Sequence, residues 1–76
     1  MTTNDRITRD PGTMGGKPCI RGMRITVGTI TGMVAAGHSW DEILRMYPYL
    51  EDGDIAAALA YVTWLAEAYD ADLQPA

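Results

Sequence analysis

Residues that crosslink small proteins are nearly absent from this sequence. It has 76 residues, with one cysteine, Cys19, and one histidine, His38. A single cysteine excludes an intrachain disulfide and is typical of a reducing compartment, and these two side chains give no ligand set for a metal. Because a chain of this length buries only about 60% of its unfolded surface, we expect a second copy or a partner protein to add to its core.

Long apolar runs are absent as well. The longest run, about residues 55–66, is shorter than the roughly 20 residues that cross a bilayer. The polar residues 1–9 are not followed by the apolar segment of a signal peptide. We therefore expect a cytoplasmic protein with no membrane partner. Because no repeat or linker divides the chain, we expect a single domain over residues 1–76.

Catalytic groups are sparse. His38 lies in a Gly-His-Ser turn and is explained as a surface turn residue, Cys19 as a small buried apolar residue, and Ser39 as a helix cap. The glycines of residues 12–17 invite comparison with a phosphate-binding loop, but their spacing does not match that motif and Pro18 follows the lysine. We therefore expect no catalytic residue, no metal or other cofactor and no enzymatic activity.

Charge is divided unevenly along the chain, whose formal net charge is −4. Residues 1–24 hold five basic and two acidic residues, a balance of +3, whereas residues 41–76 hold eight acidic residues and one arginine, a balance of −7. Such asymmetry suggests two surfaces with different partners. The alternative is that the asymmetry only aids solubility and dimer orientation. The candidate contact residues for nucleic acid or a toxin are the five basic residues of the first third: Lys17, Arg21, Arg24, Arg6 and Arg9. For these residues the alternatives are a solvated surface or, for Arg24, a structural ion pair with a carboxylate.

The glycine-rich residues 15–27 predict a β-turn module. Their aliphatic side chains need a core, which argues against a solvated linker, and their glycines and proline interrupt a helix. We expect a short strand at residues 7–9. Two more strands, at residues 18–20 and 23–25, are expected to form a small β-hairpin around Gly22, whose φ is positive in the tight connection.

Helix signals follow this module. Thr26 is the expected N-cap of a helix over residues 27–36. Gly37 ends that helix as a left-handed C′ residue. A capping box over residues 39–42 then begins a second helix, which we expect to run from Trp40 to Met46 or Tyr47.

A third and longer helix is predicted over residues 52–69, before a disordered tail at residues 70–76; residues 1–5 are expected to fray. The fold class is therefore mainly α with a small N-terminal β-hairpin. It consists of a β-strand/turn module over residues 7–26 and a three-helix unit over residues 27–69, arranged as a helix-turn-helix.

The third helix has little polar surface before Glu67. A helix that is apolar nearly all round is buried on more than one side, and one small domain does not cover it. We therefore expect a dimer or partner interface on this helix, at Ala58, Tyr61, Trp64 and Leu65. The start of the helix, residues 51–54, is acidic, which suits the helix dipole but repels the phosphates beside a DNA major groove.

Four motifs in order resemble the bacterial domain-of-unknown-function family 433. They are G-K-P-x-I-x-G-x-R-I-x-V over residues 16–27, A-G-H-S-x-D-E-I-L over residues 36–44, Y-P-x-L over residues 47–50 and D-I-x-A-A-L-x-Y over residues 54–61. The resemblance covers about residues 7–65. It implies a homeodomain-like helix-turn-helix behind a β-hairpin, and an association with VapB-like antitoxins, which are encoded beside PIN-like ribonucleases that they restrain.

Three functions follow from these residues and this resemblance. The first is a non-enzymatic antitoxin-like protein that dimerises through the third helix, binds a PIN-like ribonuclease toxin and regulates its own transcription. In this function Arg21 or Arg24 offers a cation to the carboxylate cluster that holds the nuclease metal, or the acidic second half covers a basic RNA-binding groove. The second is a DNA-binding transcriptional regulator without a toxin. The third is a structural dimerisation or adaptor module.

Overall fold

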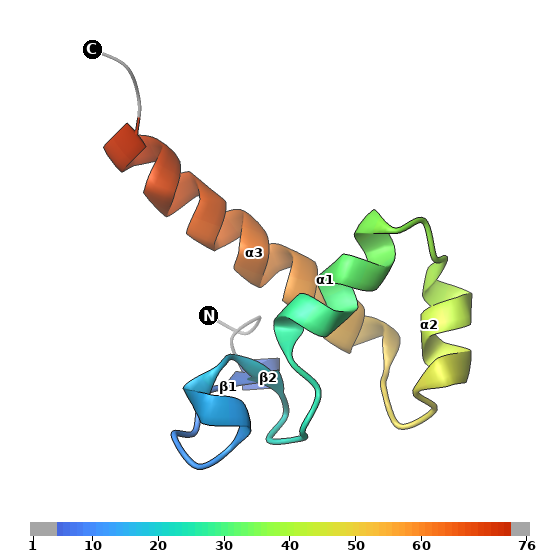
Figure 1. The fold of residues 1–76 in the computed structure, drawn as a ribbon. Helices are drawn as coiled ribbons and strands as arrows, with labels where there is room; N and C mark the ends of the chain where they lie inside the picture. The colour runs from blue at the N-terminus through green and yellow to red at the C-terminus, as the bar shows by residue number, and fades with distance from the viewer. Residues whose placement is uncertain (1–4, 74–76) are drawn as a thin grey trace.

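The computed structural model describes residues 5–73, so most of the segment expected to fray lies outside the described residues. The chain is mainly helical with a small two-stranded antiparallel sheet, as the sequence predicts. In chain order (Figure 1), the elements are β1 (Ile7–Thr8), η2 (Met14–Gly16), β2 (Cys19–Ile20), α1 (Val27–Ala35), α2 (Trp40–Met46) and α3 (Asp52–Leu73). No described helix is both long and apolar enough to cross a membrane.

The sheet pairs different segments from those expected. β1 runs antiparallel to β2, with Ile7 opposite Ile20. Residues 23–25, the expected hairpin partner of β2, form no strand. Between these segments, the Ile20 N–H donates to the Ile25 carbonyl at 3.0 Å, and one isolated bridge joins Cys19 to Thr26. The chain enters α1 directly after that bridge, so this edge of β2 has no room for a longer ladder.

A tight turn follows β2 and sets the direction of Arg21. Both central residues have positive φ, 45° at Arg21 and 75° at Gly22, and the Met23 N–H donates to the Ile20 carbonyl at 2.7 Å. This pair of positive φ values is that of a type I′ turn. The prediction for Gly22 is confirmed. A positive φ at a non-glycine residue such as Arg21 is uncommon and needs support from its surroundings.

The helix caps are those that the sequence predicts. The Thr26 hydroxyl accepts the Thr29 N–H at the start of α1. Ser39 and Glu42 form both bonds of a capping box on α2, and the bond from the Ser39 N–H lowers the pKa of the Glu42 carboxyl. Gly37 has a φ of 98°, as expected of a residue that follows a helix C-terminus.

The third helix is longer than predicted. It runs to Leu73, so residues 70–73, expected to belong to a disordered tail, are helical; residues 74–76 of that tail lie outside the described residues. No glycine or proline interrupts the chain between Gly53 and Pro75, and alanine-rich sequence has a high helix propensity. Nothing in the sequence therefore ends the helix at Tyr69.

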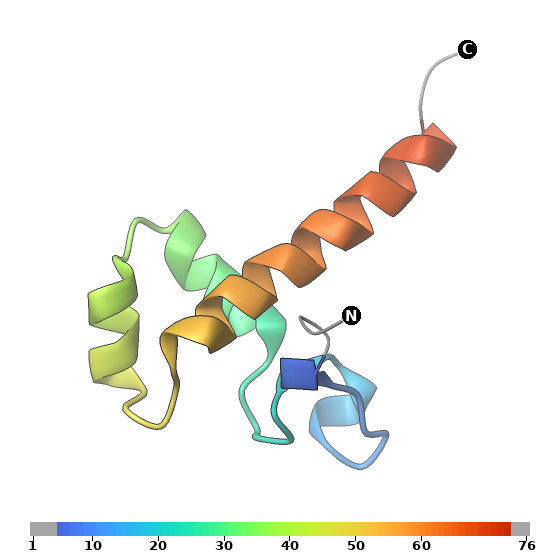
Figure 2. The same cartoon turned by 180° about the vertical axis from the view of Figure 1, so that it is seen from behind.

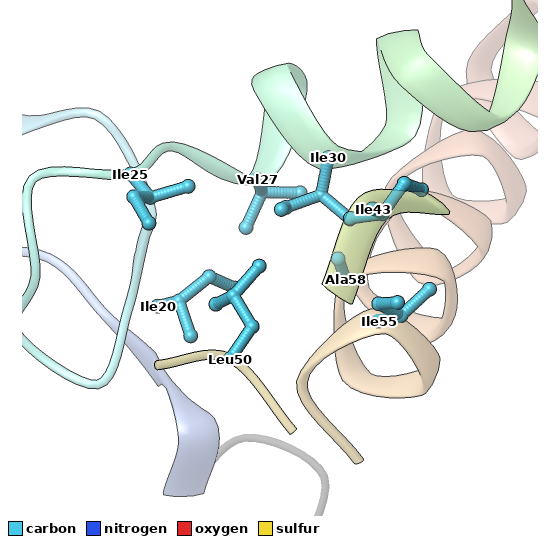
Figure 3. Packing of buried hydrophobic residues seen from close by; sticks show 8 residues of the cluster. All are labelled: Ile20, Ile25, Val27, Ile30, Ile43, Leu50, Ile55 and Ala58. Atoms are coloured by element: carbon cyan, nitrogen blue, oxygen red, sulfur yellow. The ribbon is translucent and has the colours of Figure 1, made fainter. Parts of the chain in front are cut away.

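The core lies where the first half of α3 meets α1, α2 and the segment around β2. Figure 3 shows aliphatic side chains from all of these parts pointing into one cluster: Ile20, Ile25, Val27, Ile30, Ile43, Leu50, Ile55 and Ala58. Figures 1 and 2, taken from opposite sides, both show the second half of α3 extending past every other element. One helix thus has a packed half and a projecting half.

Candidate functional site

A buried carboxylate at the start of α3 organises the basic residues of the first third. The Asp54 side chain is 0% exposed. Its Oδ1 accepts hydrogen bonds from Arg6 Nη1 at 2.9 Å and Arg21 Nε at 3.0 Å. Its Oδ2 accepts from Arg21 Nη2 and from the Glu51 N–H, both at 2.8 Å. We call Asp54, Arg6 and Arg21 the clasp.

The clasp keeps its carboxylate charged. Burial alone raises the pKa of Asp54, but the hydrogen bonds from Arg21, from the Glu51 N–H and from Arg6 outweigh it and lower the pKa to about 2. A buried charge is tolerated when it is paired and its hydrogen-bonding capacity is filled, and here both oxygens accept two bonds. The group therefore acts as a structural anion.

Two of the five predicted contact residues belong to the clasp, so their guanidinium groups form ion pairs with Asp54 instead of standing free at the surface. Arg6, which directly precedes β1, also donates to Glu51 Oε1 at 2.8 Å. Arg21, in the turn after β2, also donates from Nη2 to the Tyr49 carbonyl at 3.0 Å. These bonds fasten the β module to the start of α3. From the sequence, Asp54 is interpreted only as part of an acidic helix start that suits the helix dipole, so its pairing with both arginines is not predicted.

Gly53 lies directly beneath the Arg6 guanidinium. A Cβ built on Gly53 would lie 2.7 Å from Arg6 Cζ and 2.9 Å from Nη2. The Gly53 backbone is helical without a positive φ, so the contact that a larger residue would disturb here is the close approach of the Arg6 guanidinium.

The other three basic residues form no ion pair with described residues. Arg9 makes one long bond, from Nε to the Gly16 carbonyl at 3.4 Å. Lys17 and Arg24 are exposed, and they line different hollows. The first, about 480 Å³, lies beside the start of α1 and is lined by Lys17, Pro18, Thr26, Gly28 and Thr29. The second, about 400 Å³, is lined by Met23, Arg24, Ile25 and Tyr49. The five predicted contact residues therefore do not form one continuous basic surface.

Only some of the residues predicted to form an interface on α3 are accessible to a partner. Ala58 is 0% exposed and packs inside the core cluster, one turn after Ile55, so it is unavailable to a partner. Trp64, by contrast, is 62% exposed. Tyr61 and Leu65 are half-buried, and the Tyr61 ring centroid lies 6.0 Å from that of Trp64.

Val62 is 39% exposed, although helical spacing places it on the same side of α3 as the buried Ile55 and the half-buried Leu59. The body of the protein covers Ile55 but does not reach Val62. We call residues 61–73 the distal half of α3 and residues 52–60 its proximal half (Figure 2).

Groups suited to chemistry are not assembled in the described part of the chain. Among the side chains that the structure describes, no group of three His, Cys, Asp or Glu is placed to hold a metal ion. Cys19 is buried, and its Sγ donates to the Lys17 carbonyl at 3.3 Å. His38 lies on the surface with Nδ1 3.5 Å from Glu42 Oε1, at the capped start of α2.

Comparison with known proteins identifies the family. Residues 7–62 match the family described as protein of unknown function (DUF433). The chain belongs to this family. A crystal structure of a DUF433 member protein from Anabaena variabilis ATCC 29413 has a TM-score of 0.78 and 31% identity to this chain, over 97% of this chain and 73% of that one.

The DUF433 chain is also similar to uncharacterized protein y4eO of Sinorhizobium fredii (strain NBRC 101917 / NGR234). The two are 38% identical over 55 residues, which is 72% of this chain and 25% of y4eO. The chain therefore matches about a quarter of the length of that relative. The DUF433 match includes the core and two residues of the clasp, Arg21 and Asp54; it begins at Ile7, directly after Arg6, and ends at Val62, next to the boundary where α3 leaves the body.

Proposed function

We propose that this DUF433 protein is a non-enzymatic, antitoxin-like protein that dimerises and binds a PIN-like ribonuclease toxin, and that regulates its own transcription as a secondary role. One observation carries the protein-binding part of this proposal. The distal half of α3 projects from the body (Figure 1), and both Trp64, 62% exposed, and Val62, 39% exposed, on another side of the helix, are open to a partner.

An exposed tryptophan on a projecting helix is costly unless a partner covers it. Aromatic residues are enriched at the centres of protein interfaces, where they supply much of the binding energy. A 76-residue chain also has a small core of its own. Association through the distal half would bury apolar surface that no other described element covers, which supports a dimer.

The hollow beside Arg24 supports a contact with an acidic nuclease site. Of the two arginines predicted to meet such a site, Arg21 is held by Asp54, whereas Arg24 forms no ion pair with described residues. Arg24 lies between Met23 and Tyr49 in an open hollow, and the Arg21 bond to the Tyr49 carbonyl fixes one wall of it. Arg24 is thus the arginine that we propose to meet the carboxylate cluster of the toxin, with Arg21 holding the hollow in shape.

Co-expression with the nuclease-like product of the adjacent gene tests the proposal. We expect the two proteins to copurify and the growth defect caused by the nuclease to be rescued. Arg24→Ala should weaken the complex, whereas Arg9→Ala, which also removes an exposed arginine, should not. Absence of both complex and rescue would overturn the proposal.

A DNA-binding regulator is the second candidate, and the exposed Lys17 and Arg24 favour it. The start of α3, which would have to read bases in a helix-turn-helix, is instead covered by Arg6 and Arg21 and carries the exposed carboxylates Glu51 and Asp52. DNA contact would therefore come from the β module. A gel-shift assay with the protein's own promoter at about 100 mM salt tests it, because phosphate contacts make binding salt-sensitive. A dimer that binds neither toxin nor DNA would instead indicate the adaptor module.

A further inference from the structure

We propose that two copies of this chain pair through an antiparallel crossing of their α3 helices centred on Ala60, with Trp64 of each copy over Ala56 of the other and Glu67 of each copy beside Arg6 of the other. This inference rests on the proposed dimer and specifies its geometry. It is carried by the shape of the exposed face of α3, by its charges and by the free donors of Arg6.

The exposed face of α3 is continuous across the boundary between its two halves. At about 100° per residue, Ala56, Ala60, Trp64 and Glu67 lie within roughly 80° of one another around the helix, and all four are exposed. The opposite side carries the buried Asp54, Ile55 and Ala58 and then the half-buried Tyr61 and Leu65. Ala57, which is also buried, lies about 20° beyond Trp64 around the helix and marks one edge of the exposed face. A partner that covers Trp64 along the helix axis therefore also covers the two alanines.

This face is complementary to itself in size when two copies run antiparallel. A two-fold axis at Ala60 places Trp64 of one copy opposite Ala56 of the other, so that each large ring lies over a small side chain. Alanine at positions 56 and 60 lets the helix axes approach to about 8 Å, the close end of the usual range. A parallel pair would instead place Trp64 against Trp64 and Glu67 against Glu67. A two-fold interface of this kind closes on itself.

The charges of the face agree with the same register. The axis at Ala60 places Glu67 of one copy opposite Gly53 of the other, and the Arg6 guanidinium lies over Gly53. Arg6 uses Nη1 for its bonds to both Glu51 and Asp54. Its Nε and Nη2, which lie over Gly53, donate to no acceptor among the described residues. Arg6 is 37% exposed, so an incoming carboxylate can reach these donors.

Cysteine crosslinking tests the register. Position 60 faces itself across the axis, and two helices about 8–10 Å apart bring such Cα atoms within the 4.4–6.8 Å range of a disulfide. Under mild oxidation, Ala60→Cys should give a covalent dimer. Ala66→Cys, an exposed position about a third of a turn round the helix, should not. Wild type should also stay uncrosslinked, because Cys19 is buried.

Charge reversal tests the contact with Arg6 without altering the clasp. Glu67→Lys should raise the dimer dissociation constant about tenfold at low salt, because each of the two symmetric contacts becomes repulsive; Glu67→Gln should have a smaller effect. Sedimentation gives both constants. Thermal unfolding of the monomer should be unchanged, since Glu67 is exposed.

The outcomes separate this inference from the proposed function. A dimer in which Ala60→Cys and Ala66→Cys crosslink equally would overturn the antiparallel register and leave the dimer standing. A wild-type monomer at about 100 µM would overturn the dimer itself. If the chain is monomeric and Trp64→Ala abolishes toxin binding, the face belongs to the toxin, and the inference is wrong although the antitoxin proposal survives.

Discussion

The two halves of α3 are both mostly apolar in sequence but have different surroundings. In the proximal half, Asp54, Ile55, Ala57 and Ala58 are buried, whereas no residue from 61 to 68 is buried. The first half is covered by α1, α2 and the clasp, and the second extends beyond them (Figure 1). We infer that the proximal half determines the folding of the monomer and the distal half its association. Substitutions can therefore separate the two properties.

The largest effect on folding is expected at Ile55. Its side chain is fully buried in the core cluster, so Ile55→Ala should lower the free energy of unfolding by about 3–4 kcal/mol through lost burial and the cavity left behind. Val62→Ala, which shortens an exposed aliphatic residue of the distal half, should lower it by less than about 1 kcal/mol. Urea denaturation at one fixed protein concentration measures both. Similar losses at the two positions would contradict the division of the helix.

Asp54 should have the next largest effect, and one that depends on pH. The pKa of its carboxyl falls from 3.8 to about 2 on folding, so the unfolded chain binds the proton more tightly. The clasp therefore contributes fully above about pH 4, and its contribution is lost as the pH falls towards 2, an effect on the order of 2 kcal/mol.

Asp54→Asn keeps the shape and removes the charge. It should cost about 2–3 kcal/mol at pH 7, less than for a pair with no access to water, because Arg6 and Arg21 are partly exposed. The loss of stability between pH 4 and pH 2 should shrink in this variant. Chemical denaturation across that range checks the sign, and an unchanged pH profile would exclude Asp54 as its source.

Local features of the fold are predictable from the sequence, and the clasp is not. The Thr26 cap, the capping box of Ser39 and Glu42, and Gly37 all depend on residues within one helical turn, so short sequence patterns contain the information. The bonds of Asp54 to Arg6 and Arg21 join residues 48 and 33 positions apart. No pattern in a single sequence specifies which distant charges meet.

The candidate site shows the same limit. Periodicity correctly gives α3 two apolar sides, but it does not show where the rest of the protein stops covering them. Ala58 was therefore assigned to an interface although it lies in the core, and the exposure of Val62, 39%, was not predicted. The turn after β1 is signalled locally and closes with the Thr13 N–H to Asp10 O bond of 2.8 Å, but no local signal specifies that β1 then pairs with β2.

The third expected effect concerns association and falls on the distal half. Trp64→Ala should raise the dimer dissociation constant by at least about 30-fold, because a central interface tryptophan contributes roughly 2 kcal/mol or more. The stability of the monomer should change by less than about 0.5 kcal/mol. Trp40→Ala is the matched control, since Trp40 is also exposed but lies on α2. Sedimentation equilibrium compares the three proteins, and equal weakening by both substitutions would argue against a specific role for α3.

The smallest effect tests the reason for a glycine inside the proximal half. Gly53→Ala should stabilise the helix by up to about 1 kcal/mol through propensity, but in the wild-type chain the new methyl group would meet the Arg6 guanidinium. The gain should therefore be small or absent in wild type and should appear in an Arg6→Ala background. A double-mutant cycle of unfolding free energies measures this coupling, which we expect to be about 1 kcal/mol. Additive effects would mean that Arg6 moves aside without loss and that Gly53 is not needed for the clasp.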